Sequence, residues 1–559
     1  MKQNCIFKLM LMGACLLFLD ACTDIVPIEN PIDEIVDNQE TRIEVLGLNM
    51  GADTKVTLTG TTFAWQPGDT IAVWTGATDK DNNGSYKKNV VAADLSLPVT
   101  LNAGEYRFNY AIYPASAASL FYSDSKTVYV RLPISYKLSE VENNTTPLPM
   151  IAENDKASNS LTFYNVAGLL RLTVNGIPTD NGTYLKIDFH NKVSGDFKVT
   201  SSDGTIGLSE ITTPYESYIH ATDTLVITEL KGKSSVTINL PLPAITYSDI
   251  TVSAWNSSNV PVKACVEVFN YTAAREHGKT KEVSLANGVF QYAAHKYFMI
   301  APANLQYSNG TFSFHENAYD MTFTTNVYSG TTEEKSARDA LFNSSGTFDL
   351  FAWGASGYSN ITPWGTDYSG NLDLGDADWG NFNSVGPYAK GTWQTPSRVA
   401  LDYLFSDRTS YYSKASFGTV NNVPGLIILP DQFVDPQKNN GNAAIKSTHS
   451  DYTSNVYTAE DWVYMQTAGA AFLPCAGKTH YSEYLNSRGY YWTSTGEYSG
   501  DGGGNGYADR AYYLNFGLSL QTPIVAAGIK LYDSGNSTGK IKGFEKRTPA
   551  AVRLVHYIR

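Results

Sequence analysis

The chain has 559 residues, and at about 150 residues per domain this length predicts three or four domains. Its net charge is −13, with 17% charged residues and no basic block, which argues against nucleic acid as a partner. Three of the five cysteines lie within the first 22 residues, so Cys265 and Cys475 alone cannot form a disulfide framework. We therefore expect large hydrophobic cores to stabilise the protein.

The N-terminus has the features of an export signal. Two lysines precede an apolar run over residues 9–19, which is shorter than the roughly 20 residues that span a bilayer. The next residues, Leu19-Asp20-Ala21-Cys22, read as a bacterial lipobox, although Asp20 replaces the usual small residue. We predict a signal peptide over residues 1–21 and a diacylated Cys22 that tethers the protein to a membrane surface.

An acidic tether follows over residues 22–42. It contains six acidic residues, two prolines and no basic residue before Arg42, a composition typical of a solvated linker. Within it, Ile25-Val26 and Ile35-Val36 could pair as an edge strand, so we expect removal of residues 22–42 to leave an open groove in the first sandwich. Arg42 offers the first trypsin-type cleavage site of the mature chain; the alternative is that Arg42 is an exposed linker residue.

From residue 43 to about 290 the pattern is that of β-strands. Apolar residues alternate with polar ones, as in residues 170–174, and turn residues such as Asn181-Gly182 separate the runs. Short alternating strands with regular turns predict antiparallel sandwiches. A polar gap near residues 140–160 divides this part into a first sandwich over 43–155 and a second over 156–296.

The remaining residues, 297–559, are richer in Gly, Trp, Tyr and Asn and predict an α+β domain. Thr395-Pro396 marks the expected start of one helix, and Thr458 with Asp461 three residues later marks the start of another. The expected buried residues of these helices are Leu401, Leu404, Phe405, Trp462 and Met465. The whole chain is therefore predicted to be mainly β, with helices confined to the third domain.

Four stretches in the first 200 residues carry a family resemblance. They are Thr41-Arg42, TKVTLTGTTFAWQPGDTIAVW (54–74), LTFYNVAGLLRLTVNG (161–176) and NKVSG (191–195). Together with the lipobox, they make the first two domains similar to the fimbrillin-like (type V pilus) family of Gram-negative outer-membrane lipoproteins. The resemblance implies two transthyretin-like β-sandwiches, lipoprotein transport, proteolytic trimming at an arginine, and polymerisation by strand exchange.

A second resemblance covers the third domain. The matching stretches are 301–314, 349–357, 378–383, 391–405, 425–433, 468–478, 489–498, 511–516 and 550–555. They resemble a bacterial surface domain related to the C-type-lectin-like and formylglycine-generating-enzyme fold. This resemblance implies surface binding or adhesion and says little about chemistry.

The sequence does not predict a catalytic, metal or cofactor site. The eight histidines never occur at a metal-ligand spacing, and Gly535-Asn536-Ser537-Thr538-Gly539 lies in a polar turn rather than a nucleophile elbow. Cys475 lies in an apolar run and is expected to be buried and inert. The residues Asp373, Asp376 and Asp378 could bind calcium, but the remaining ligands of a loop site are missing. We therefore expect no enzyme activity.

Aromatic side chains are the remaining candidates for ligand binding. The chain is 13% aromatic, and an exposed Tyr or Trp ring can stack on a sugar. The tryptophans of the third domain are expected to be mostly core: Trp353, Trp379, Trp393, Trp462 and Trp492. The loop residues Tyr481, Tyr484 and Tyr498 are the candidate ligand-binding residues.

These observations favour a cell-surface lipoprotein pilin of the outer membrane that adheres to a glycan or protein through its third domain. Because residues 550–559 belong to a motif of that domain, we expect the subunit to accept a strand from another pilin without donating one, which would place it at a fimbrial tip. Two alternatives stay open. One is a non-polymerising glycan-binding lipoprotein, and the other is an enzyme of the formylglycine-generating type with a reactive Cys475.

Overall fold

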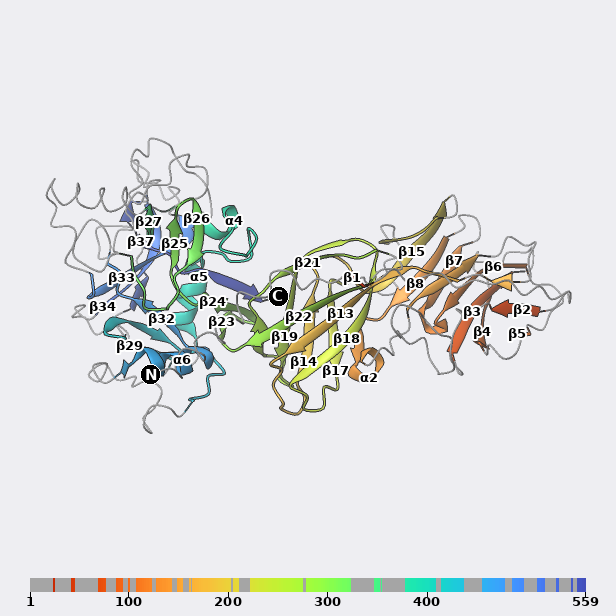
Figure 1. The fold of residues 1–559 in the computed structure, drawn as a ribbon, viewed down its shortest axis with the longest axis horizontal. Coiled ribbons are helices and arrows are strands. Elements are labelled where there is room, and N and C mark those ends of the chain that lie inside the picture. Colours follow the sequence, from red (N-terminus) through yellow and green to blue (C-terminus); the bar gives the residue numbers. More distant parts are fainter. Residues whose placement is uncertain are drawn as a thin grey trace, which may run out of the picture. The chain divides into compact units, whose positions relative to one another are not determined.

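The computed structural model divides the chain into two compact units. Unit 1 comprises Met1–Asn259 and Phe269–Leu285, and unit 2 comprises Val260–Val268 and Ala286–Arg559 (Figure 1). The structure describes residues 24–25, 42–45, 69–76, 87–93, 99–100, 107–122, 127–142, 148–153, 160–161, 163–202, 205–210, 222–274, 278–322, 346–351, 353, 378–408, 414–436, 455–477, 485–496, 510–517, 529–531, 544–545 and 550–558. None of the helices within these ranges is long and apolar enough to cross a membrane.

Unit 1 contains a β-sandwich built from the earlier strands. One sheet has the order β12-β10-β6-β3-β4 and another the order β16-β15-β8-β7, and a small sheet β11-β2-β5 accompanies them. Their bounds are β2 (Arg42–Val45), β3 (Asp69–Gly76), β4 (Lys87–Ala93), β5 (Val99–Thr100), β6 (Arg107–Tyr113), β7 (Ala118–Tyr122), β8 (Thr127–Leu132), β10 (Met150–Glu153), β11 (Ser160–Leu161), β12 (Phe163–Asn165), β15 (Gly195–Ser202) and β16 (Thr205–Glu210). Ala72, Ile112 and Ile151 of the first sheet share one core with Val130 and Phe197 of the second.

The strand pairing of this sandwich crosses residue 155, the predicted end of the first domain. Phe197 of β15 lies opposite Val130 of β8, so strands more than 60 residues apart in sequence share a sheet. A bidentate ion pair between Arg131 and Asp196 at 2.6 and 2.7 Å fixes this register. Periodicity alone could not reveal the pairing, because it shows which face of a strand is apolar and not which strand is its neighbour.

The later strands of unit 1 form two further runs, β18-β13-β22 and β19-β14-β17-β9, with β21 paired to β19. Their bounds are β9 (Ser135–Lys137), β13 (Ala167–Asn175), β14 (Tyr184–Asp188), β17 (Thr224–Thr228), β18 (Ser235–Pro243), β19 (Thr246–Trp255), β21 (Phe269–Thr272) and β22 (Gly278–Ala286), and the short helix α2 (Leu138–Val141) follows β9. The predicted inward residues Leu170, Leu172 and Val174 are buried. Tyr271 donates a hydrogen bond to the Leu169 carbonyl at 3.0 Å and thereby links the two runs.

The protein is mainly β, as predicted, but not every strand pair is antiparallel. β13 and β22 run parallel over seven residue pairs, from Leu169 opposite Gly278 to Asn175 opposite Ser284. A parallel pair needs a long crossover connection, which β14 to β21 provide here.

Unit 2 is an α+β structure around one large aromatic core. Its sheets are β23-β24-β38, β26-β25-β27, β28-β37-β33-β34-β35 with β36 on β34, and β31-β29-β30-β32. The bounds are β20 (Pro261–Cys265), β23 (Val289–Ala293), β24 (Lys296–Ile300), β25 (Leu305–Ser308), β26 (Thr311–Phe314), β27 (Thr347–Phe348), β28 (Leu350–Phe351), β29 (Ala415–Val420), β30 (Val423–Ile428), β31 (Val456–Tyr457), β32 (Ala471–Pro474), β33 (Arg488–Gly496), β34 (Arg510–Gly517), β35 (Ile529–Leu531), β36 (Phe544–Glu545), β37 (Ala550–Ala551) and β38 (Val555–Ile558). The core contains Trp353, Trp379, Trp393 and Trp492.

The described part of unit 2 contains three short α-helices: α4 (Trp379–Phe382), α5 (Arg398–Asp402) and α6 (Ala459–Thr467). The predicted capping box of α6 is confirmed, because Thr458 and Asp461 exchange backbone and side-chain hydrogen bonds. The first predicted helix begins later than expected, with Ser397 rather than Thr395 as the N-cap. It continues as one π-helical turn over Tyr403–Asp407. The expected buried residues of both helices are buried: Leu401, Leu404, Phe405, Trp462 and Met465.

Candidate functional site

A strand of the acidic tether pairs with unit 1. In β1 (Asp24–Ile25), Asp24 lies opposite Lys279 and Ile25 lies opposite Gly278, at the start of β22. The same two residues of β22 pair with β13 on their other side. The tether therefore completes a sheet, and its loss would leave the backbone of residues 278–279 open on one edge.

Part of the predicted edge strand is thus confirmed, but at another place. Ile25 is in a strand, whereas Ile35-Val36 lies outside the described residues, as does Cys22. We expected the tether to leave a groove in the first sandwich, yet β1 pairs with β22 in the later sheet of unit 1. The sequence could not have shown this, because Gly278 is about 250 residues away along the chain.

Arg42 is the first residue of β2. It lies opposite Thr100 of β5, and the following residues Glu44 and Val45 pair with β11. The peptide bond after Arg42 is therefore inside a paired strand. Because a protease binds its substrate as an extended, unpaired segment, cleavage here requires this end of β2 to leave β5.

The opposite edge of the same sheet is unsuited to strand addition. β18 is the last strand of its run, and its residues Pro241 and Pro243 lie opposite Leu169 and Ala167 of β13. Alternate residues of a strand direct their backbone groups to the same edge, and prolines are placed where the missing N–H faces away from the ladder. The outer edge of β18 therefore lacks two successive donors, and the backbone of Gly278 and Lys279 opposite β1 is the better acceptor of a strand.

In unit 2 the candidate ligand-binding residues Tyr481, Tyr484 and Tyr498 all lie outside the described residues. The five tryptophans of this unit's motifs are buried, as expected, and offer no stacking face. The exposed large apolar side chains in the described part of unit 2 are Phe382, Val399, Val434, Val456, Val463 and Tyr464.

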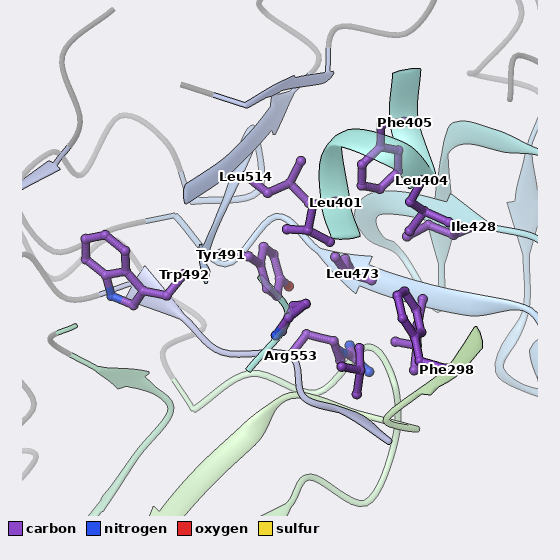
Figure 2. A pocket seen from close by; sticks show the side chains of 13 residues that line it. Phe298, Leu401, Leu404, Phe405, Ile428, Leu473, Tyr491, Trp492, Leu514 and Arg553 are labelled. Atoms are coloured by element: carbon purple, nitrogen blue, oxygen red, sulfur yellow. The ribbon is translucent and has the colours of Figure 1, made fainter. Parts of the chain in front are cut away.

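A small cavity lies inside the core of unit 2 (Figure 2). Leu401, Leu404 and Phe405 project into it from α5 and the π-helical turn, and Tyr491 and Trp492 line it from β33. Its volume of about 20 Å³ suits one water molecule and is far below the roughly 300 Å³ of a ligand pocket. The cavity is therefore a gap in packing and not a binding site.

Beside this cavity, the fully buried Arg553 is held by neutral oxygens. Its guanidinium donates to the Asn304 side chain at 3.0 Å and to the carbonyls of Ala301 and Phe472 at 2.9 and 2.6 Å. Burial lowers the pKa of Arg553 to about 10. The role of Arg553 was not predicted from the sequence, although a single cation inside the apolar run AAVRLV (550–555) could have indicated it. The contacts join three segments of the unit, so we regard Arg553 as structural.

Cys475 is buried, and desolvation raises the pKa of its thiol above the ordinary value. The Asp378 carboxylate caps α4 by accepting hydrogen bonds from Gly380 and Asn381, while Asp373 and Asp376 lie outside the described residues. Across the described part of the chain, no three His, Cys, Asp or Glu side chains come together as a metal site would require.

Comparison with known proteins finds similarity at the level of structure only. No family model and no curated protein matches the chain. Among solved structures, it is similar to a candidate cell adhesion protein from Bacteroides ovatus, with 12% identity, a TM-score of 0.26, and coverage of 44% of this chain and 91% of that one. It is also similar to the fimbrial anchor protein Mfa2 from Porphyromonas gingivalis, with 11% identity, a TM-score of 0.20, and coverage of 41% and 80%.

A third similarity is to the tip fimbrial protein Mfa3 from Porphyromonas gingivalis, crystallised with a C-terminal truncation. The identity is 10%, the TM-score is 0.17, and the match covers 37% of this chain and 76% of that one. Identities and TM-scores of this size do not assign the chain to a family.

Proposed function

We propose that this protein is a fimbrillin-like lipoprotein pilin that is anchored through Cys22, trimmed after Arg42 and assembled by donor-strand exchange. We place it at the fimbrial tip, where residues 297–559 bind a glycan or protein on another surface. The pairing of β1 with β22 is the observation that carries the proposal. It makes the tether an integral strand of the sheet, so that proteolysis can convert a closed edge into an acceptor edge.

Strand addition at this edge is supported by the geometry around β22. The incoming strand would satisfy the same backbone groups of Gly278 and Lys279 that β1 satisfies. On the far side of the sheet, Pro241 and Pro243 disfavour addition to β18. Together these features direct a donor strand to one edge.

The tip position is supported by the way β38 is held. Val555 to Ile558 pair antiparallel with Ile300 to Tyr297 of β24, and Val555 also exchanges backbone hydrogen bonds with Gln394 at 2.7 Å. Donating β38 to a neighbour would break the sheet of unit 2 from which it comes. This strand is therefore unsuited to act as a donor.

Two alternatives remain for the same chain. A non-polymerising glycan-binding lipoprotein would use the same anchor and unit 2, with Arg42 uncut. An enzyme of the formylglycine-generating type would need a reactive Cys475, and the burial of this thiol disfavours it.

The test compares the intact protein with the protein cut after Arg42, each alone and with candidate pilins, by size-exclusion chromatography. The proposal expects a complex only between the cut protein and a pilin tail, and no homopolymer. Long homopolymers of the cut chain would make it a stalk subunit. Failure of every pilin to bind would favour the non-polymerising lipoprotein. Retention of a Cys22→Ala variant in the membrane fraction would disprove the anchor.

A further inference from the structure

A group of polar and aromatic residues lies on one face of β14 and β19 in unit 1, where Tyr184 and Lys186 are half-buried and Trp255 is buried, with 6% of its surface exposed. Tyr184 is opposite Trp255, and Lys186 is opposite Ser253, so all four side chains share one face of the sheet. The Tyr184 and Trp255 rings have centroids 6.5 Å apart and an interplanar angle of 26°. Lys186 Nζ lies 3.5 Å from the centroid of the Trp255 ring and 5.9 Å from that of Tyr184. We call these residues, with Asn259, the Lys186 platform.

A tight turn places Asn259 at the edge of the platform. Asn259 Oδ1 accepts hydrogen bonds from the Tyr184 hydroxyl at 2.5 Å and from Lys186 Nζ at 3.4 Å. The turn is held by backbone and side-chain bonds to Asn256, each at 3.0 Å. Asn259 itself has a φ of 61°, a left-handed conformation that asparagine tolerates well. The amide is therefore prepositioned.

Lys186 is a half-buried cation without a carboxylate. No Asp or Glu oxygen of the described residues lies within ion-pair distance of its Nζ; its neighbours are two aromatic rings and an amide. Desolvation accordingly lowers the pKa of Lys186 below its ordinary value. Asp188, two residues further along β14, accepts a hydrogen bond from the backbone N–H of His190. An unpaired, partly desolvated cation is unusual on a chain of net charge −13.

We propose that the Lys186 platform is a binding site for an acidic sugar. The sugar carboxylate would pair with Lys186, whose ammonium group would move off the Trp255 ring to meet it. The Trp255 ring is buried in this structure, with Lys186 lying over it, and the movement of Lys186 would uncover a ring face next to Tyr184. That face would take the C–H face of the sugar, and the Asn259 amide would bind a hydroxyl group. The site lies in unit 1 and does not depend on adhesion through unit 2.

Charge and shape together decide the class of ligand. A neutral sugar would leave the ammonium group over the Trp255 ring, where the cation–π contact competes with stacking. A carboxylate compensates for moving the Lys186 ammonium group off the Trp255 ring, because it provides an opposite charge in a partly desolvated place. A small inorganic anion would use the charge but would gain nothing from the two aromatic faces.

The experiment is a calorimetric titration of the full mature chain with trigalacturonic acid, its trimethyl ester and acetate. We expect the acid to bind at least tenfold more tightly than the ester, and acetate not to compete at equal concentration. Lys186→Met should weaken binding of the acid at least tenfold, Lys186→Arg should largely preserve it, and Asn259→Ala should weaken it several-fold. Lys281→Met is the matched control, because Lys281 is also half-buried and lies 5.5 Å from the Phe269 ring centroid in the same unit.

The proposal is overturned if no saturable binding of the acid is seen, if the ester binds as well as the acid, or if Lys281→Met weakens binding as much as Lys186→Met. Effective competition by acetate would reduce the site to a simple anion site and overturn the sugar assignment. Circular dichroism and melting of both lysine variants should match those of the unmodified protein, and Lys186→Arg separates loss of charge from any loss of fold.

Discussion

The Asp378 carboxylate accepts a hydrogen bond of 2.8 Å from the backbone N–H of Thr395 and so joins two loops of unit 2 that lie 17 residues apart. The same oxygen accepts from Gly380 and Asn381 at 2.9 and 3.3 Å at the start of α4. Burial nevertheless raises the pKa of Asp378 from 3.8 to about 6, because desolvation outweighs these hydrogen bonds. Protonation of this one carboxylate therefore makes the stability of unit 2 depend on pH.

We predict that Asp378 makes unit 2 less stable as pH rises from 4 to 7. The folded-state pKa lies above the unfolded value, so the folded state binds the proton more tightly; this stabilisation is present below about pH 4 and is lost as pH passes through about 6. Asp378→Asn keeps an acceptor oxygen and removes the titration. The difference in unfolding free energy between the two proteins should change by up to about 3 kcal/mol over this range. Urea denaturation at four pH values measures it, and parallel pH profiles would contradict it.

The contact between these two loops of unit 2 also requires a glycine at position 380. A Cβ atom at this position would lie 1.5 Å from the Trp393 carbonyl oxygen and 2.5 Å from its carbon, and neither backbone atom can move easily. Gly380→Ala should therefore destabilise unit 2 by about 3 kcal/mol or more, as forced overpacking does. The exposed neighbour Asn381 provides the control, since Asn381→Ala should stay within about 0.5 kcal/mol. Equal melting temperatures for the two variants would contradict this prediction, because they would show that the loops of Gly380 and Trp393 can move apart without loss of stability.

Local features of this chain were predictable where local interactions decide them. Thr458 and Asp461 form the capping box of α6 because both partners lie within one turn. Thr395 could not be assigned from sequence in the same way. Its backbone and hydroxyl group bind Asp378 and Trp379 of another loop, which moves the N-cap of α5 to Ser397. Tertiary contacts outweigh the local signal at this place.

The same distinction applies to the candidate assembly site. The alternation of Leu170, Leu172 and Val174 correctly predicted a buried face, and Ile25 was correctly predicted to be in a strand. The partner of each strand was not predictable, because a two-residue period contains no information on neighbours. The pairing of β1 with β22 became visible only in the structure.

Arg553 should be indispensable to unit 2. Arg553→Met would leave the buried Asn304 oxygen and the Ala301 and Phe472 carbonyls without their donor, which we expect to cost about 3–5 kcal/mol. The control is Arg398→Met on α5. Arg398 is partly exposed, and its 3.3 Å ion pair with Asp402 and its contact with the Tyr512 ring, at 4.2 Å from the centroid, are each worth about 1 kcal/mol or less. Denaturant titration measures both variants. A loss for Arg553→Met no larger than that of the control would mean that the cation is dispensable.

Cys475 should not react in the native protein. Its side chain is fully buried, and desolvation raises the pKa of the thiol, so the nucleophilic thiolate is scarce at neutral pH. A soluble variant that begins after Cys22 has two thiols, Cys265 and Cys475, and both are buried and outside any disulfide. A thiol reagent should label neither until the protein is unfolded. Rapid native labelling that disappears in Cys475→Ser would revive the enzyme alternative.

The last prediction concerns the strand that closes the sheet. Replacing both residues of β1 with proline, as Asp24→Pro/Ile25→Pro, removes every backbone donor that the tether offers to Gly278 and Lys279. Only one of two successive strand residues directs its backbone N–H toward β22. Because both residues are replaced, that hydrogen bond is lost in either case. The backbone of Gly278 and Lys279 should then become available to another strand without proteolysis. The uncut double variant should therefore bind a pilin tail that the uncut parent protein does not bind. Size-exclusion chromatography of both proteins with the tail measures this. The matched control is Ile35→Pro/Val36→Pro, which alters the other stretch of the tether that the sequence predicts as a possible edge strand. If only the control variant gains binding, then the 35–36 stretch protects the acceptor edge and β1 does not. If neither variant gains binding, pairing of the tether is not what prevents the uncut protein from binding the tail.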